Sequence, residues 1–493
     1  MQSLFFRAAV IAALSAGLAG CGGGSSAPPA VAPTPPTSGA TLTIACADPA
    51  FAKAVADRAN GWAGRSGAAI RVESKPPAAV SGADLAVVRP AELGELAAAG
   101  RLVPLPQSLQ AVDHPLQWPR IASVFRQNLT GWGGQVQGIP LAGDGFVLIY
   151  RSDRFSDPAT AAAFQMKVGR PLAPPATWED AAEVAEFFAT TSGKPSLPPV
   201  PADPDRLLAE YNHVAACYDR PAMTDTDLAA TKGAALALGF HTDPATGAAR
   251  VGAPGFRAAA GWLGRVAKFR ATGPDDPVAA LDTGTAAFGV LSLAEIGRLP
   301  KGPDGAVDAR FGVAPIPGSR AYFGPDAKPR LAARGVNLVP YLGGGGWVGV
   351  VFGSSPNQPA AWDLLADLAA PASATALLSN PALGVGPFRT EHVSAERTAQ
   401  WQRYGFDADR NRALAAAVRE YVGLGLVNPA LVLRTPDQRP LMAALADAVR
   451  QAATGQVPAE QAIDQAVAAW TAHDAGVPAD ELKKWRRNAA GQR

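Results

Sequence analysis

Short β-prone runs alternate with helical stretches from residue 41 onward, and this alternation limits the folds open to the chain more than any other feature. The apolar run 41–46 precedes Asp48 and Pro49, which suit the N-cap and the first turn of a helix over 49–62. The next elements are a strand pattern at 70–74, another at 83–88 and a helical stretch at 91–99. Strands that alternate with helices predict an α/β fold.

The same kind of pattern continues to the C-terminus. Thr177, with Asp180 three residues later, forms a variant of the capping box and begins a helix. Two helices over 439–470, broken at 455–458, come last. Further helices are predicted at 205–217, 226–238, 256–269, 357–368 and 411–421, and further strands at 146–150, 286–290, 311–314 and 347–352.

The first twenty residues have the pattern of a secretory signal peptide. Arg7 precedes the apolar run 8–19, which is shorter than the roughly 20 residues that a membrane-spanning helix needs. The run ends in Leu18-Ala19-Gly20-Cys21, which resembles the bacterial lipobox, whose cysteine receives a diacylglycerol. We therefore expect removal of residues 1–20 and a lipid on Cys21 that anchors an exported body, in the periplasm or extracellular space, to the cell membrane. An ordinary secretory peptide with a chance cysteine is the alternative.

The segment after Cys21 supports the anchored interpretation. Residues 22–40 read GGGSSAPPAVAPTPPTSGA, a composition that cannot form a core. Glycine and serine make such a segment flexible, and proline keeps it extended. The segment 21–40 is therefore predicted to be a tether between the lipid and the folded body.

Length and charge set the broad class of the body. About 450 residues follow the tether, which by size alone predicts two or three domains. The chain is 48% hydrophobic and 17% charged, with a net charge of +2. This balance is ordinary for a water-soluble protein and gives no basis for a nucleic-acid partner. After the signal peptide, no run is long and apolar enough to cross a membrane.

Two cysteines remain for the folded body if Cys21 carries lipid. Cys46 and Cys217 lie far apart in the sequence, so no local pattern pairs them. An exported location permits a disulfide. Two buried free thiols are the simpler alternative, because free cysteine is among the most buried residue types.

Several short segments occur in an order and spacing typical of one protein family. The most telling is GIPLAGDGFVLIY at 138–150, followed by PATWE at 175–179. The others are DLAVV at 84–88, GRLVPL at 100–105, GTAAFG at 284–289, FGVAPIP at 311–317, GGGW at 344–347 and TGQVPAEQA at 454–462. Together they resemble the extracellular solute-binding proteins of carbohydrate ABC importers, the maltose-binding-protein-like family.

The resemblance implies a two-lobed periplasmic-binding-protein fold of type II, with a ligand cleft between lobes that crossing hinge strands join. Lobe 1 would consist of residues 41–142 and of a return of the chain at 313–350. Lobe 2 would consist of residues 143–312 and of a second part at 351–480, which includes the C-terminal helices. Residues 481–493 would form a polar tail. The cleft would lie beyond the C-terminal ends of the strands.

The function that the resemblance implies is capture of a small solute, expected to be a mono- or oligosaccharide. The protein would act as a monomer, without a cofactor or metal, and would deliver the solute to the permease subunits of an ABC importer by closing its lobes. A ligand can drive such closure only by binding the closed form better than the open one.

Two side chains are the main candidates for ligand contact. Asp144 lies in the segment that the resemblance places at the first crossing between lobes, where it would accept hydrogen bonds from sugar hydroxyls. The alternative is a turn residue in Ala-Gly-Asp-Gly. Trp347 would stack on a sugar face, or else is a core tryptophan.

Five further residues are weaker candidates for the ligand site. Gly145, Gly345 and Gly346 would let the backbone approach a ligand closely, although plain turns explain them equally well. Asp48 is either a helix cap or a ligand contact. Arg89 follows a strand, where ligands bind, but a lone arginine there is often a surface residue.

The sequence shows no catalytic motif. The five histidines are scattered without metal-ligand spacing, and no GxSxG elbow occurs. The run Gly343 to Gly346 lacks the Lys-Ser/Thr of a phosphate-binding loop. We therefore expect a binding protein rather than an enzyme. A secreted carbohydrate-active enzyme and a surface receptor without a transport role are the alternatives.

Overall fold

The computed structural model describes residues 39–223, 239–324, 326–425 and 428–492. The signal peptide, Cys21, nearly all of the tether and the predicted helix 226–238 lie outside these ranges. The chain divides into two units, Met1–Pro36 and Thr37–Arg493, and the description below concerns the second. Among the described residues, no helix has the length and apolar character that crossing a membrane requires.

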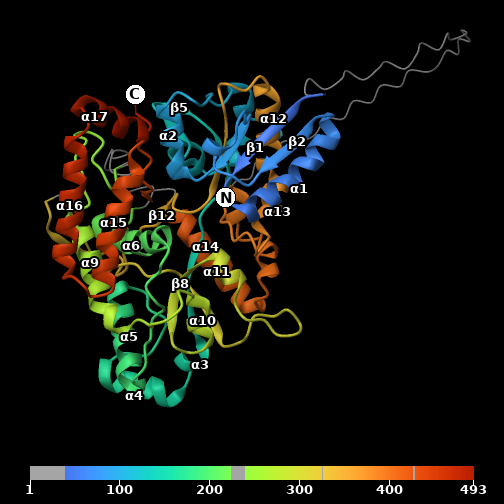
Figure 1. Cartoon of the computed structure of the whole chain (residues 1–493). Helices are drawn as coiled ribbons and strands as arrows, with labels where there is room; N and C mark the ends of the chain where they lie inside the picture. Colours follow the sequence, from blue (N-terminus) through green and yellow to red (C-terminus); the bar gives the residue numbers. More distant parts are fainter. Residues whose placement is uncertain (1–38, 224–238, 325, 426–427, 493) are drawn as a thin grey trace, which may run out of the picture. The chain divides into compact units, whose positions relative to one another are not determined.

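A five-stranded sheet forms the core of the first lobe (Figure 1). The strand order is β2-β1-β3-β13-β6, where β1 pairs in parallel with β2 and β3, and β13 runs antiparallel to β3 and β6. The strands are β1 (Thr41–Cys46), β2 (Ala69–Glu73), β3 (Leu85–Val88), β6 (Ile139–Ala142) and β13 (Trp347–Val351). Strands β3, β6 and β13 are buried throughout, as expected for strands covered on both faces.

The helix α1 (Pro49–Ser66) begins as its sequence predicts. Asp48 Oδ1 accepts a hydrogen bond from the Phe51 N–H at 2.7 Å, and Pro49 opens the first turn. The helix ends at Gly67, whose φ of 73° is the left-handed conformation of a helix C-terminus. Its buried face, which includes Phe51, packs against the first sheet.

Helix α12 (Gln358–Ala369) also belongs to the first lobe, contrary to the expected division at residue 351. It packs against α1, β6 and β13, and Figure 1 shows it beside the blue N-terminal elements. Trp62 Nε1 donates to Asp363 Oδ2 at 2.9 Å between the two helices. The chain leaves β13 and turns straight back onto the same sheet, because α12 has an apolar face to bury.

A three-stranded antiparallel sheet, in the order β8-β7-β9, forms the centre of the second lobe. Its strands are β7 (Phe146–Arg151), β8 (Phe288–Ser292) and β9 (Phe311–Ala314). The helices of this lobe are α3 (Ser152–Phe155), α4 (Pro158–Val168), α5 (Trp178–Ser192), α6 (Pro204–Asp219), α9 (Pro254–Val266), α10 (Pro277–Asp282), α11 (Leu293–Gly297) and α14 (Ala408–Gly425). As predicted, Thr177 caps α5, with its hydroxyl accepting from the Asp180 N–H at 3.1 Å.

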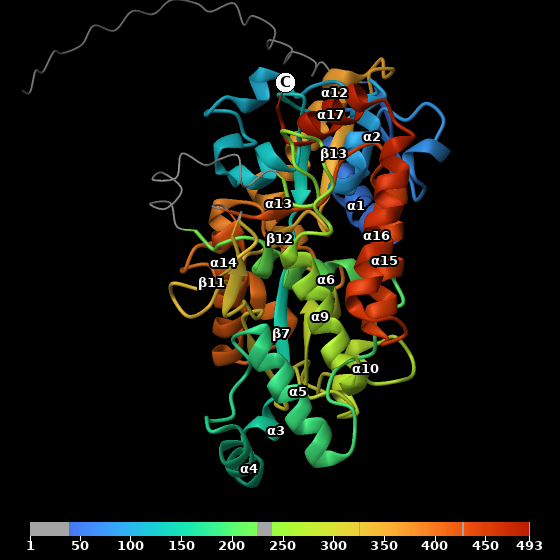
Figure 2. The same cartoon turned by 90° about the vertical axis from the view of Figure 1, so that its left-hand side faces the viewer.

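The C-terminal helices cover the second lobe and then reach the first. Helices α15 (Gln438–Ala453) and α16 (Ala459–Ala475) pack along α6 and α9 (Figure 2). The sequence predicts a polar tail over 481–493, but the structure has the helix α17 (Ala479–Ala489) there. Arg486 is buried and pairs with Asp474 at 2.7 Å, while the Asn488 carbonyl accepts from the Gly133 N–H. These tertiary contacts hold a segment whose own composition is strongly polar.

Short segments complete the chain between these elements. They are α2 (Leu93–Ala98), α13 (Pro371–Leu378), β4 (Gly131–Trp132), β5 (Gln135–Val136), β10 (Ala321–Phe323), β11 (Pro329–Leu331), β12 (Tyr341–Leu342) and β14 (Ala430–Leu431). Strands β12 and β14 pair in parallel outside the two main sheets.

The two lobes are joined where β6 ends and β7 begins. Only residues 143–145 separate these strands, although β6 belongs to the first sheet and β7 to the second. Gly143 and Gly386 exchange backbone hydrogen bonds of 2.9 and 2.8 Å, so a second crossing segment runs beside the first. This arrangement is the two-lobed α/β fold that the sequence predicts.

Both cysteines of the described body are free and buried. Cys46 ends β1 in the first lobe, and Cys217 lies in α6 of the second. Burial raises the pKa of each thiol to about 12. Of the two sequence interpretations, the structure has the free thiols. Since the thiolate is the reactive form, burial and the raised pKa both disfavour reaction of these cysteines in the folded protein.

We therefore predict that thiol reagents do not modify the folded body. In the Cys21→Ser chain, intact-mass measurement after maleimide treatment should show no adduct in buffer and two adducts in guanidinium chloride. Modification in buffer at the rate of a free thiol would contradict the buried positions, and the absence of adducts after denaturation would indicate a disulfide.

Candidate functional site

A cavity of about 370 Å³ lies where the two lobes meet, and we call it the cleft. Both lobes and both crossing segments contribute side chains to it. Its lining includes Asp48, Phe51, Arg89 and Trp347 from the first lobe, Asp203, Asp205, Arg206, Ala209, Ser292 and Ala294 from the second, and residues 143–146, 344–346 and 382–385 between them. The volume is in the range of small-molecule binding sites.

Asp144 lies in the crossing segment and holds the glycine-rich loop of residues 343–346. Its Oδ2 accepts from the Gly343 N–H at 2.6 Å and its Oδ1 accepts from the Gly345 N–H at 2.5 Å. The side chain is only 3% exposed. Burial raises the pKa of the Asp144 carboxyl, while the two N–H donors and the charge of Arg89 act against this rise. The carboxylate thus positions the loop, because each of its oxygens accepts a backbone hydrogen bond from it and the side chain is almost fully buried.

The glycines of this loop are required by the packing of the loop itself. A Cβ on Gly345 would lie 2.6 Å from Asp144 Oδ1. Gly346 has a φ of +71°, and a Cβ there would lie 2.6 Å from the Ala142 carbonyl oxygen. Gly145 is equally constrained, since its Cβ would lie 2.3 Å from Leu293 Cδ1. All three predicted glycines line the cleft, and all three have a structural reason to be glycine.

Arg89 and Trp347 lie side by side because of the register of two neighbouring strands. Val88 of β3 pairs with Val348 of the antiparallel strand β13. Arg89, which follows Val88, therefore faces Trp347, which precedes Val348. The Arg89 guanidinium lies 3.7 Å from the Trp347 ring centroid, a cation–π contact. Trp347 also stacks on Phe51 with centroids 5.0 Å apart, and only 5% of it is exposed. In this arrangement Trp347 supports Arg89 rather than offering a free face to a ligand.

The Arg89 guanidinium has spare hydrogen-bonding capacity. It donates to the Gly346 carbonyl at 3.2 Å, and among the described residues it forms no ion pair with a carboxylate. Burial lowers its pKa, and the charges of Asp48, Asp144 and Asp205 oppose that effect. A guanidinium has five N–H donors, so most of those on Arg89 remain for a ligand.

Asp48 combines two of the expected roles. One oxygen caps α1, as described above, and the other accepts no hydrogen bond from a described residue. The side chain is half-buried and lines the cleft. It can therefore cap the helix and accept a hydrogen bond from a ligand at the same time.

The second lobe contributes two carboxylates from the start of α6. Asp203 caps this helix, its Oδ1 accepting from the Asp205 N–H at 2.8 Å. The Asp205 carboxylate accepts no hydrogen bond from any residue in the described ranges. Partial desolvation and the neighbouring Asp203 raise the pKa of Asp205, while Arg89 across the cleft acts against them. Asp205 is not among the site residues expected from the sequence, although the pattern Asp-Pro-Asp at a helix start is a signal for carboxylates at a helix N-terminus.

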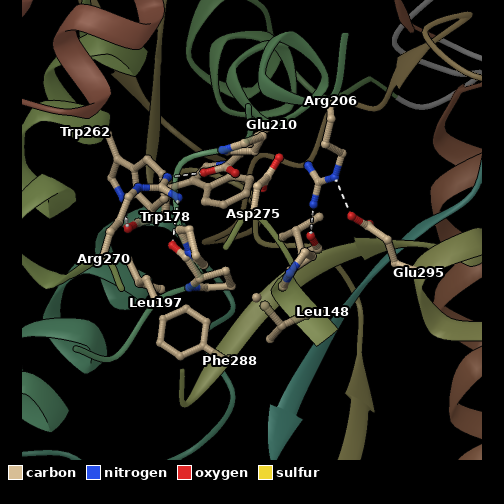
Figure 3. Close-up of a pocket in the computed structure, with 16 residues that line it drawn as sticks. Leu148, Trp178, Leu197, Arg206, Glu210, Trp262, Arg270, Asp275, Phe288 and Glu295 are labelled. Atoms are coloured by element: carbon tan, nitrogen blue, oxygen red, sulfur yellow. Dashed lines mark hydrogen bonds and ion pairs between the residues drawn. The ribbon is translucent and has the colours of Figure 1, made fainter. Parts of the chain in front are cut away.

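Arg206 fixes the start of α6 against the second sheet. Its Nε donates to Glu295 at 3.0 Å and its Nη2 donates to the Val290 carbonyl at 2.5 Å. Glu295 in turn accepts from the N–H and hydroxyl of Ser292, which caps α11. Figure 3 shows Arg206 and Glu295 beside a separate cavity of about 40 Å³, where Arg270 pairs with Glu210. That cavity has room only for water, so the cleft is the larger candidate site.

The histidines give no metal site within the described residues. No group of three or more His, Cys, Asp and Glu side chains in those ranges is placed to hold an ion. Burial lowers the pKa of His213 and of His241 to about 3, so both are neutral interior groups at physiological pH.

Comparison with known proteins agrees with the geometry. Residues 67–406 match the family model of bacterial extracellular solute-binding proteins. No curated protein matches the sequence.

Solved structures share the fold at low sequence identity. A maltose-bound MalE3 of T. maritima is 15% identical with a TM-score of 0.59, over 87% of this chain and 98% of that one. A solute-binding protein of Agrobacterium radiobacter K84 in complex with ribitol is 17% identical with a TM-score of 0.60, over 88% and 98%. UgpB of Mycobacterium tuberculosis in complex with glycerophosphocholine is 13% identical with a TM-score of 0.61, over 89% and 100%.

We predict that Asp144→Asn destabilises the fold. An amide has one acceptor oxygen and a donor NH₂, so one of the two loop N–H groups would face another donor. The free energy of unfolding should fall by about 1–3 kcal/mol, the cost of an unsatisfied buried polar group. Urea denaturation measures it, with the exposed Asp57→Asn as control. Equal stability of the Asp144 and Asp57 variants would contradict the positioning role.

Proposed function

The chain belongs to the bacterial extracellular solute-binding proteins, and from this premise we propose that it captures a sugar or polyol in the cleft and delivers it to an ABC importer. The observation that carries the proposal is the cleft lining itself. Asp48 and Asp205 offer free carboxylate oxygens from opposite lobes, and Arg89 offers free N–H donors. A polyhydroxyl compound matches such a set, because each hydroxyl both donates and accepts.

Residue roles follow from the contacts described above. Arg89, Asp48 and Asp205 would contact the solute, and Trp347 with Phe51 would hold Arg89 in place. Asp144 would keep the 343–346 loop in position, so that the loop's remaining backbone groups face the cleft. This assignment replaces direct hydroxyl binding by Asp144 and sugar stacking on Trp347 with supporting roles.

Transport requires that the solute-loaded and the empty protein differ in the arrangement of their lobes. Because contacts come from both lobes, a bound solute stabilises the arrangement in which both reach it, and this differential binding drives closure. Permease subunits would then recognise the closed form. The solved structures with maltose and ribitol support a polyhydroxyl solute, since they share this fold.

A thermal-shift screen of the body against sugars, polyols and amino acids tests the solute class. A ligand that binds only the folded state stabilises it by about 2.7 kcal/mol at roughly one hundred times its Kd. We expect a raised Tm with a sugar or polyol. Shifts only with amino acids would contradict the proposed class.

Asp205→Asn should then weaken binding of the solute identified by the screen by about tenfold or more, since a lost hydrogen bond to a charged group has about that effect. The Tm of the free protein should not change, because the Asp205 carboxylate holds no described partner. Asp113→Asn, an exposed change outside the cleft, is the matched control. Equal affinity of the two variants in calorimetry would remove Asp205 from the site.

We further propose that the protein is a lipoprotein held to the membrane through Cys21, with the proline-rich tether allowing the body to turn. The support is the lipobox-like sequence and the tether composition. In cells that process lipoproteins, the protein should partition with membranes, and Cys21→Ser should release it into the soluble exported fraction. Retention of the Cys21→Ser protein in the membrane fraction would contradict the anchor.

A further inference from the structure

The cleft continues into a second, basic cavity, and we propose that this outer cavity binds an anionic group on an extended ligand whose hydroxyl-bearing end lies in the cleft. The inference rests on the proposed function, because it names a feature of the same solute. The group would be a carboxylate or a phosphate, which share the negative charge and the acceptor oxygens that arginine and lysine bind.

The two cavities are adjacent. Ala294 of α11 and Ala382 line both, and the outer cavity has a volume of about 640 Å³. Both alanines are exposed, and a methyl group is the whole of each side chain. The shared boundary therefore carries only two methyl groups, and a ligand longer than the cleft would reach the outer cavity past them.

The outer cavity has an excess of positive charge. Arg298, Lys301 and Arg403 line it. Arg298 is paired with Asp276 at 3.2 Å, whereas no carboxylate in the described part of the chain lies within 4.0 Å of the other two cations. Glu295 is the only carboxylate in the lining, and Arg206 and Ser292 already occupy it.

The cleft has the opposite balance, and this fixes the orientation of the ligand. Four aspartates line it, at positions 48, 144, 203 and 205. Of its two arginines, Arg206 is neutralised by Glu295 and only Arg89 is unpaired. An anionic group placed there would meet net repulsion, while hydroxyl groups would find acceptors. The anionic end therefore lies outward, beyond the two alanines.

Calorimetry on the full chain tests the proposal with matched probes: the neutral, terminal-carboxylate and terminal-phosphate forms of glycerol, glucose and maltotriose. We expect the anionic form of at least one set to bind about tenfold more tightly than its neutral form, the effect of two modest ion pairs. The preference should shrink as salt rises. The carboxylate and phosphate arms show which anion the cavity takes.

Variants at the outer cavity show whether this cavity causes the preference for the anionic forms. Lys301→Glu with Arg403→Glu should abolish it and leave neutral-form affinity within about twofold, because both side chains lie outside the cleft. Ala382→Trp, which narrows the shared boundary of the two cavities without changing charge, should also abolish the preference for the anionic form. Arg58→Glu on the exposed face of α1 is the control and should leave the preference intact. Each variant's Tm verifies folding.

Three results would overturn the inference. Neutral forms that bind as well as anionic forms would remove the outer subsite and leave the sugar-binding function standing. An anionic preference that survives both the charge reversal and the blocking variant would place the anion elsewhere. Failure of every probe to bind would count against the proposed function and this subsite together.

Discussion

The carboxylate of Asp144 is the contact on which the candidate site depends. It lies in the three-residue segment that joins the sheets of the two lobes, and it binds two backbone N–H groups of the 343–346 loop. That loop leads directly into β13, where Trp347 and the Arg89 guanidinium that lies over its ring begin the cleft wall. One buried side chain therefore connects the joint between the lobes to the groups that would meet a solute.

The lobes contribute different chemistry to the cleft. The first lobe presents the Asp48 carboxylate and a guanidinium held on an aromatic ring. The second presents only carboxylates, at the start of α6, where the Arg206–Glu295 pair fixes them. Neither set surrounds a small molecule by itself. A solute that engages both sets favours the arrangement of lobes that brings them together, and in the proposed function a transporter would recognise this arrangement.

Much of the fold could be predicted from the sequence, because its signals are local. The cap at Asp48, the strand 311–314 and the break between α15 and α16 all appear where the sequence places them. The contacts within the site were harder to predict, since they join residues that lie far apart in the sequence. Asp144 and Trp347 do line the cleft, but their partners are the loop N–H groups and Arg89, which no local pattern reveals. The assignment of α12 to the first lobe likewise depends on tertiary packing.

The central claim is that a solute held between the lobes draws them together, and a distance measurement between spin labels tests it most directly. Labels at Lys53→Cys on α1 and Lys167→Cys on α4 would report on opposite lobes. In the Cys21→Ser chain only these two positions should be labelled, because the two native thiols are buried. The account predicts a broad or longer distance distribution without solute and a shorter, narrower one with it, and loss of the change in Asp205→Asn at the same solute concentration. An unchanged distribution at saturating solute would contradict closure as the mechanism.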